Sequence, residues 1–242
     1  GALYAPKPQH QTLASMIFSD TDETVTEGPA AFDFKSSGYL AEAQHQWRTA
    51  GLSLIAGGGY SSVDEDLTTT VALPPPLPSI EDSEHDDVYH ANGYLYANLR
   101  LPMPVLWTFG LAFESAQGGL RDRERVNPKA GVTWQISSET TFRAAVVKKL
   151  NRDLLNDQTL EPTQVAGFNQ FYQDLFGTDM LRYGAALDHR FSKRLFGGVE
   201  GARREIDSLY TWLDVNTLDT SVRESDWYET LGRAYLYWAP LE

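Results

Sequence analysis

The feature that most constrains the fold of this chain is a nearly unbroken alternation of apolar and polar side chains over residues 89–101. One face would carry Tyr89, Ala91, Gly93, Leu95, Ala97, Leu99 and Leu101, and the other His90, Asn92, Tyr94, Tyr96, Asn98 and Arg100. A period of two residues predicts a β-strand. The segment is longer than the roughly five or six residues common in soluble proteins. It is long enough for a tilted membrane strand, which needs about 9 to 11 residues.

Similar alternation recurs along the chain. It is clear in 105–114, 126–136, 181–191 and 228–238, weaker in 36–48, 50–60, 139–149 and 194–206, and poorest in 11–19. No window holds the roughly 18 consecutive apolar residues that a transmembrane helix requires, which excludes a helical membrane protein. We therefore predict an all-β fold: an antiparallel up-and-down transmembrane β-barrel of about ten strands. Residues 1–242 would form this single domain.

The connections between the expected strands alternate between short and long. Short ones lie near residue 49 and at 102–104, 137–138 and 192–193, and long ones at 20–34, 62–87, 117–123, 151–178 and 207–224. In an up-and-down sheet, alternate connections meet at the same rim. Bacterial outer-membrane barrels have short periplasmic turns and longer outer loops. The pattern therefore predicts a protein of the bacterial outer membrane, with long outer loops near 62–87 and 151–178.

Large aromatic side chains lie beside the short turns. Tryptophan is enriched where a barrel meets the membrane–water interface. We expect an aromatic girdle in contact with outer-membrane lipid, made of Trp47, Trp107, Trp134, Phe191 and Trp238. A soluble fold would bury any one of these side chains in its core, but their shared position near one rim favours the girdle.

Charged residues of both signs fall on the polar faces of the expected strands. The candidates for the lumen are Glu42, Arg100, Glu114, Lys129, Arg143, Arg182, Asp188, Arg190, Glu200, Arg204, Glu229 and Arg233. A barrel of about ten strands is only slightly wider than the eight-stranded kind that side chains can fill. Opposite charges would pair there, so we expect a filled or gated lumen rather than a large open pore.

The segment 151–178 is rich in apolar side chains for an exposed loop. It contains the constriction candidates Phe168, Phe171, Tyr172 and Phe176. Exposed apolar clusters usually have a packing or binding role. The segment would fold into the lumen, cover the rim or contact a partner, and a short helix over about 164–176 is one option for its structure.

Composition and motifs exclude several classes of function. The net charge of −13 argues against a nucleic-acid partner, because phosphate binding needs basic clusters. The chain has no Cys, and it lacks HExxH, GxSxG and Walker motifs. The acidic segment 62–87 lacks the spacing of a calcium loop. We therefore expect no enzymatic activity, no catalytic residues, no cofactor and no metal.

Several runs in the second half of the chain resemble a known family. They are Asn-Pro-Lys-Ala-Gly-Val-Thr-Trp from Asn127, Thr-Leu-Glu-Pro-Thr-Gln-Val-Ala-Gly-Phe-Asn-Gln-Phe from Thr159, Arg-Tyr-Gly from Arg182, Phe-Gly-Gly-Val-Glu from Phe196 and Arg-Ala-Tyr-Leu-Tyr-Trp from Arg233. These runs of sequence resemble the C-terminal outer-membrane β-barrel of large bacterial tetratricopeptide-repeat proteins. The resemblance implies a periplasmic repeat domain or secretion partner, an export role and a wider barrel of which this chain forms part. The chain itself contains no helical repeats.

The leading hypothesis is thus an outer-membrane barrel acting as a porin-like conduit or as a membrane anchor, including the export pore of a larger periplasmic-repeat protein. Two alternatives stay open. The first is a soluble β-barrel or sandwich that binds a ligand inside, in which case the apolar faces would point inward. The second is a surface adhesin or assembly scaffold that binds a partner through its acidic loops.

Overall fold

The computed structural model describes residues 1–74, 77–118, 122–152, 158–171, 174–213 and 220–240. Every regular element within these residues is a β-strand. The strands are β1 (Ala2–Lys7), β2 (His10–Glu27), β3 (Ala30–Arg48), β4 (Leu52–Val71), β5 (Ile80–Leu99), β6 (Val105–Gln117), β7 (Arg123–Gln135), β8 (Thr140–Leu150), β9 (Gln164–Val165), β10 (Phe168–Asn169), β11 (Asp179–Arg190), β12 (Leu195–Leu213) and β13 (Thr220–Trp238). Among the described residues, no helix is long and apolar enough to cross a membrane.

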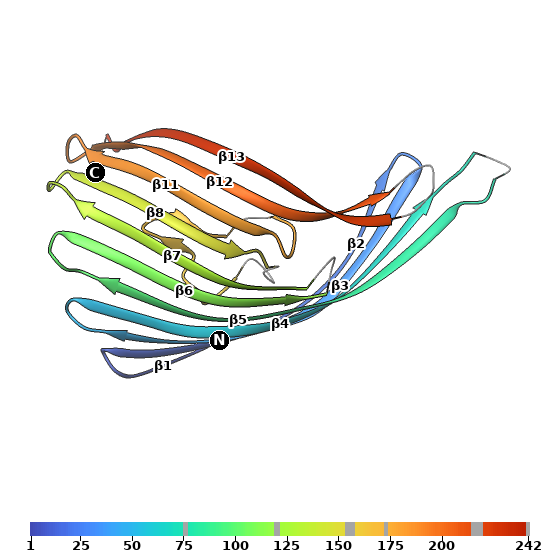
Figure 1. The fold of residues 1–242 in the computed structure, drawn as a ribbon, viewed down its shortest axis with the longest axis horizontal. Coiled ribbons are helices and arrows are strands. Elements are labelled where there is room, and N and C mark those ends of the chain that lie inside the picture. The colour runs from blue at the N-terminus through green and yellow to red at the C-terminus, as the bar shows by residue number, and fades with distance from the viewer. Residues whose placement is uncertain (75–76, 119–121, 153–157, 172–173, 214–219, 241–242) are drawn as a thin grey trace.

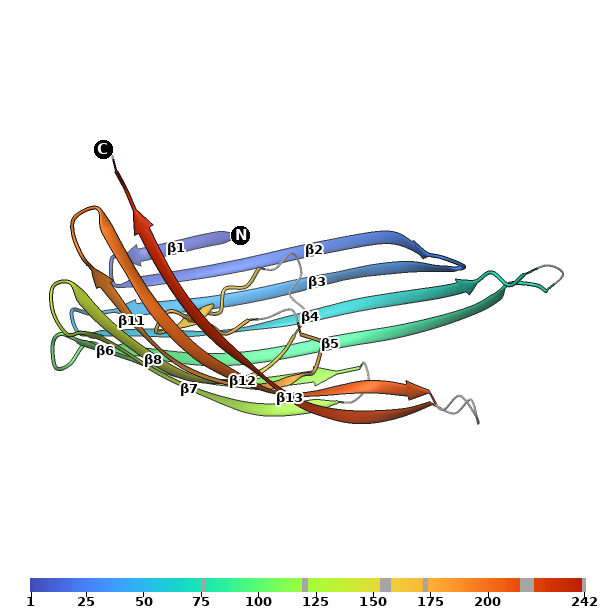
Figure 2. The same cartoon turned by 90° about the horizontal axis from the view of Figure 1, so that it is seen from above.

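Eleven of these strands form one antiparallel sheet in the order β1-β2-β3-β4-β5-β6-β7-β8-β11-β12-β13. Sequential strands are neighbours, so the predicted all-β, up-and-down order is confirmed. The sheet has one strand more than the ten expected, because β1 precedes the first segment that alternates. Figures 1 and 2 show that the sheet curves strongly, with β1 and β13 at its two edges. No pairing joins these edges within the described residues, so closure into a barrel is not part of the observed fold.

Short connections join the strands at one rim, which lies at the left of Figure 1. They comprise residues 8–9, 49–51, 100–104, 136–139 and 191–194. We call this end of the sheet the short-turn rim. The strand ends at the opposite rim are less even, because β2 to β5 have 18 to 20 residues whereas β6, β7 and β8 have 11 to 13.

The acidic segment 62–87 differs from the outer loop that we expected. Most of it belongs to β4 and β5, whose pairing continues without a break from Leu52↔Leu99 to Val71↔Ile80. The connection shrinks to residues 72–79. Polar sequence suggested a loop, but the threonines and valine at 68–71 are β-branched and favour strands. Likewise, 20–34 is a continued β2–β3 hairpin with Gly28 at φ 58 in its turn.

The two faces of the sheet differ in polarity as the alternation predicts. On β5, Leu95 is half exposed on the convex face, while its neighbours Tyr94 and Tyr96 are buried on the concave face. On β6, Phe113 is half exposed and Glu114 is fully buried. Large apolar side chains therefore cover the outside of the curve, and polar side chains fill the inside. This is the reverse of a soluble sandwich, whose apolar side chains pack inward.

Residues 151–178 connect β8 to β11, and those of them that the structure describes, 151–152, 158–171 and 174–178, lie inside the curve of the sheet (Figures 1 and 2). We call them the inserted segment. They contain the two-residue strands β9 and β10, in place of the helix considered for 164–176. The reason is local: Ala166 and Gly167 have φ of 48° and 82°. Two successive residues with positive φ form a tight hairpin turn and interrupt any helix.

Candidate functional site

The inserted segment is held against the sheet by a buried carboxylate, Glu161. One of its oxygens, Oε1, lies 2.7 Å from Lys129 Nζ of β7. The other, Oε2, lies 3.4 Å from Lys149 Nζ of β8 and 3.2 Å from Arg152 Nη2. The Tyr96 hydroxyl donates to Oε1 at 2.7 Å and accepts from Lys129 at 2.8 Å. One side chain of the segment thus joins strands β5, β7 and β8.

Two further carboxylates complete this charged cluster. Glu114 of β6 pairs with Lys149 and accepts the amide of Leu150 at 3.2 Å. Glu42 of β3 accepts the Thr159 hydroxyl at 2.6 Å and the Leu160 amide at 2.7 Å. Glu42 also lies 3.6 Å from Arg152. The three cations Lys129, Lys149 and Arg152 therefore face the three carboxylates Glu42, Glu114 and Glu161, and we call these six residues the charged cluster.

The pKa of Glu161 shows how burial and the neighbouring cations balance in the cluster. Burial by itself raises the pKa of this carboxyl, but Lys149, Lys129 and Arg152 act in the opposite direction. The cations outweigh burial, and they hold the pKa well below its usual value of 4.5. Glu161 is therefore ionised at neutral pH, and its charge is compensated without bulk water.

The tip of the hairpin packs beside a second group of charges. The guanidinium carbons of Arg143 and Arg182 each lie 5.5 Å from the centre of the Phe168 ring. Arg182 also donates to the Asn169 carbonyl at 2.8 Å. Cations over a ring face are attracted by its quadrupole. The phenylalanine is thereby held between β8 and β11.

Two glycines on the sheet make this close approach possible. A Cβ added at Gly131 would lie 2.8 Å from the Val165 side chain, and one at Gly184 would lie 2.8 Å from the Phe168 ring. Real Cβ atoms do not approach other atoms so closely. The positions of these glycines therefore match the hairpin that lies against them.

The structure brings most of the predicted lumen residues onto the concave face as ion pairs. Glu200 lies 3.5 Å from Arg182 and 2.8 Å from Arg233, and Arg143 lies 2.6 Å from Asp188. Arg204 pairs with Asp174 and Glu229, each at 2.7 Å. Glu42, Glu114 and Lys129 belong to the charged cluster.

Two of the lumen candidates lie elsewhere. Arg100 is exposed in the short connection after β5, where its amide donates to the Gly51 carbonyl at 2.9 Å. Arg190 ends β11 at the short-turn rim, 3.9 Å from Glu139. Both positions follow the alternation, but β5 ends before Arg100 and β11 ends at Arg190, so both side chains lie at the short-turn rim.

The constriction candidates are placed differently from one another. Phe168 is buried, and the Phe171 ring lies 4.6 Å from Lys149 Nζ. Phe176 is partly buried, and Tyr172 lies outside the described residues. The girdle candidates Trp47, Trp107, Trp134, Phe191 and Trp238 are all exposed, at or next to the ends of strands on the short-turn rim.

Sequence reasoning missed several central residues: Lys149, Arg152, Glu161, Tyr96 and Gln170, the last of which donates from its side-chain amide to the Tyr96 hydroxyl at 2.9 Å. Glu161 is the glutamate of the Glu-Pro-Thr-Gln run, which attracted attention only as a resemblance. Lys149 follows another lysine, and two adjacent charges break an alternating pattern. A usable signal was the Ala166-Gly167 pair, because Gly at such a position indicates a tight turn.

No family model and no curated protein matches the chain. Solved structures do match it. The ferric preacinetobactin receptor BauA of Acinetobacter baumannii has a TM-score of 0.63 and 13% identity, over 99% of this chain and 42% of that one. The pyoverdine outer membrane receptor FpvA of Pseudomonas aeruginosa PAO1 has a TM-score of 0.61 and 9% identity, over 96% and 39%. The copper transporter OprC has a TM-score of 0.56 and 9% identity, over 95% and 41%.

These similarities concern the fold. The chain has a curved, antiparallel, up-and-down sheet like that of outer-membrane β-barrel transporters. It spans about two fifths of the length of the structures it matches.

Proposed function

We propose that this chain forms all or part of an outer-membrane conduit whose interior is obstructed by the inserted segment. The observation that carries the proposal is the contact of Glu161 with Lys129, Lys149 and Arg152 inside the curve of the sheet. Apolar side chains on the convex face would contact lipid, and the charged cluster would fix the obstruction across the lumen. In lipid the edges of β1 and β13 need hydrogen-bond partners, so the sheet would be closed there, either on itself or by further strands.

The finer role that we propose is export. The family resemblance supports a pore that receives its substrate from a periplasmic repeat domain or another secretion partner. In that role the obstruction would keep the outer membrane sealed when no partner is engaged. A chain that only anchors a periplasmic domain would need no displaceable segment.

Planar-bilayer conductance of the refolded full chain tests the proposal. Glu161→Lys places a fourth cation beside Lys129, Lys149 and Arg152, so repulsion should displace the inserted segment and increase the single-channel conductance several-fold. Glu84→Lys makes the same charge change at an exposed position of β5 and should leave conductance unchanged.

Displacement must be measured separately. Val165 is fully buried, and the chain has no natural cysteine, so Val165→Cys should react with a maleimide only after the segment leaves the sheet. If Val165→Cys becomes reactive in the Glu161→Lys background while conductance stays negligible, the segment does not obstruct a conduit. An anchor would then be the better description.

A further inference from the structure

The β4–β5 hairpin projects past the rest of the sheet at the rim opposite the short turns (Figures 1 and 2). β6 pairs with β5 only over Tyr89–Leu99, whereas β4 pairs with β5 as far as Ile80. We call the paired ends 64–71 and 80–87 the outer arm. It lies outside the inserted segment and the charged cluster.

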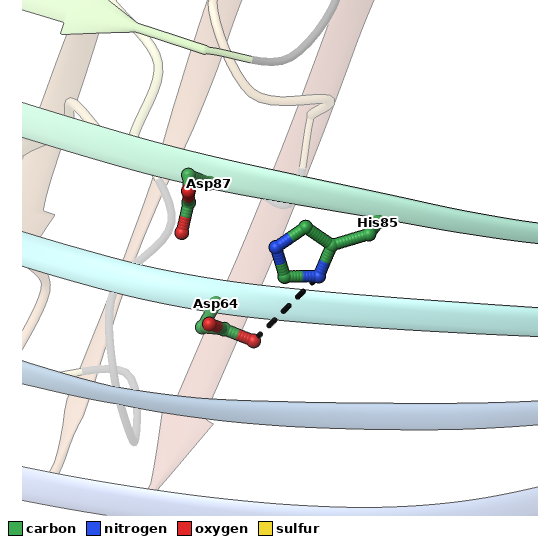
Figure 3. A group of neighbouring side chains, drawn as sticks. All are labelled: Asp64, His85 and Asp87. Carbon is green, nitrogen blue, oxygen red and sulfur yellow. Dashed lines mark ion pairs between the residues drawn. The ribbon is translucent and has the colours of Figure 1, made fainter.

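Four side chains on one face of the outer arm form a compact group. Asp64 and Asp87 are directly opposite each other across the two strands, and Asp66 is opposite His85. Ligand atoms from Asp64, His85 and Asp87 all lie within 4.8 Å of one another. The three side chains converge on one space in Figure 3. They are held there by a ladder without a bulge, so their spacing is set by the backbone.

The orientation of the imidazole is specific. Its Nδ1 lies 2.9 Å from Asp66 Oδ1, a contact that fixes one ring nitrogen. Figure 3 shows the other ring nitrogen facing the space between Asp64 and Asp87. Metal-binding histidines commonly donate their second N–H to a carboxylate, which fixes the tautomer and directs the free nitrogen at the ion. Asp66 lies outside the set of three ligand atoms and takes this supporting position.

The charge around the group also favours a cation. Two carboxylates directly opposite each other on paired strands repel, and this arrangement is destabilising by itself. Asp20 of β2 is in register with Asp64, because Ser37 of β3 pairs with both of them. Lys35 of β3 is the partner of Asp66, and Asp22 of β2 is the partner of Lys35. Lys35 therefore lies between Asp22 and Asp66, and Asp66 separates it from His85.

From this geometry we infer that the outer arm binds a first-row divalent metal ion such as Zn²⁺, with His85, Asp64 and Asp87 as ligands and Asp66 as the residue that orients His85. One imidazole nitrogen and two carboxylates suit such an ion, and water completes the shell. Ca²⁺ and Mg²⁺ prefer oxygen ligands alone. The site differs from the sequence expectation of no metal, because only the strand register brings 64 and 87 together.

Binding should depend on pH in a defined direction. The hydrogen bond that His85 donates to Asp66, with the charges of Asp64 and Asp87, raises the pKa of His85 above its usual value of 6.5. Because the metal needs a deprotonated imidazole, protons compete with it for His85, and affinity should rise with pH.

The test is a zinc titration of the full chain in detergent, after removal of metal by a chelator, at pH 6 and pH 8. All proteins carry His45→Ala, because His10 and His45 lie 3.3 Å apart near the short-turn rim and could add an imidazole site. We expect one Zn²⁺ per chain, tighter at pH 8. His85→Ala and Asp87→Asn should each weaken binding roughly tenfold or more.

The matched control is Asp86→Asn. It removes one carboxylate from the same strand, between His85 and Asp87, but its side chain points to the other face. Its zinc affinity should change less than about twofold. The inference is overturned if Asp86→Asn weakens binding as much as Asp87→Asn, if His85→Ala binds zinc normally, or if Ca²⁺ displaces zinc at equal concentration. Each of those results would indicate a diffuse acidic surface.

Discussion

At the residue scale, Glu161 links the inserted segment to three strands. Lys129 and Lys149 belong to β7 and β8, and Tyr96 belongs to β5. A buried ion pair is weak support for stability as a whole, because desolvation offsets much of the Coulombic attraction. Removing one partner is different, since it leaves an uncompensated charge in a buried site.

Glu161→Gln should therefore lower the free energy of unfolding by roughly 3–5 kcal/mol, measured by urea unfolding in detergent with tryptophan fluorescence. Adding Lys129→Met should recover part of this loss, because it removes one of the cations left without its partner. Glu84→Gln is the control for an exposed glutamate and should change stability by less than about 1 kcal/mol. A loss below about 1 kcal/mol for Glu161→Gln would mean that the cluster is solvated.

At the scale of elements, the inserted segment is a short hairpin that the sheet holds in place. Its two-residue strands pair only at Phe168↔Val165 and Asn169↔Gln164, too few pairs for independent stability. Its position depends on side chains of the sheet, such as Arg182 and Glu42. A change in the charge of the cluster should therefore displace the segment while the long strands stay paired.

Acid provides such a change. The pKa of Glu161 is lowered in the folded protein, so its stabilisation is complete above the ordinary value of 4.5 and is lost as pH falls below it. The loss is about 1.4 kcal/mol for each pH unit. Single-channel conductance of the natural sequence should consequently be higher at pH 3 than at pH 7.

Glu161→Gln cannot be protonated at this position, so its ratio of conductance at pH 3 to that at pH 7 should be smaller. An equal acid response in both proteins would assign the effect to other carboxylates.

The stability that His85 contributes to the outer arm changes with pH in the opposite sense. Its raised pKa stabilises the arm below pH 6.5, and that contribution is lost as pH rises.

At the scale of the whole molecule, the curved sheet presents an apolar exterior and a charged interior. The exposed aromatics of the short-turn rim include Trp107 and Trp134. Trp212 lies near the far end of β12 instead. If the convex face contacts lipid, Trp107 and Trp134 at the short-turn rim should contact the bilayer more than Trp212 does.

Variants that keep a single tryptophan, with the other five replaced by Phe, can measure this difference. In vesicles with brominated phospholipid, Trp107 emission should be quenched strongly and Trp212 emission weakly. Iodide in the aqueous phase should give the reverse order. Strong iodide quenching and no lipid quenching of Trp107 would indicate that the convex face lies in water.

The sequence by itself determined ten of the eleven strands of the main sheet and the face on which their side chains lie. A period of two is a local property, and a shift by one residue would move every side chain to the other face, so Leu95 and Tyr96 could be assigned to opposite sides. The alternation of short and long connections predicted the up-and-down order. It did not reveal where polar strands end, as the β-branched residues 68–71 demonstrate.

Only the tertiary structure decided which residues meet one another in the interior. Glu161 meets Lys129 and Tyr96 at separations of 32 and 65 residues, and no local period specifies such contacts. Asp64 and Asp87 likewise become neighbours only through the register of β4 and β5. The physical reason is that alternation selects a face for each side chain, whereas the curvature and register of the sheet select its partners.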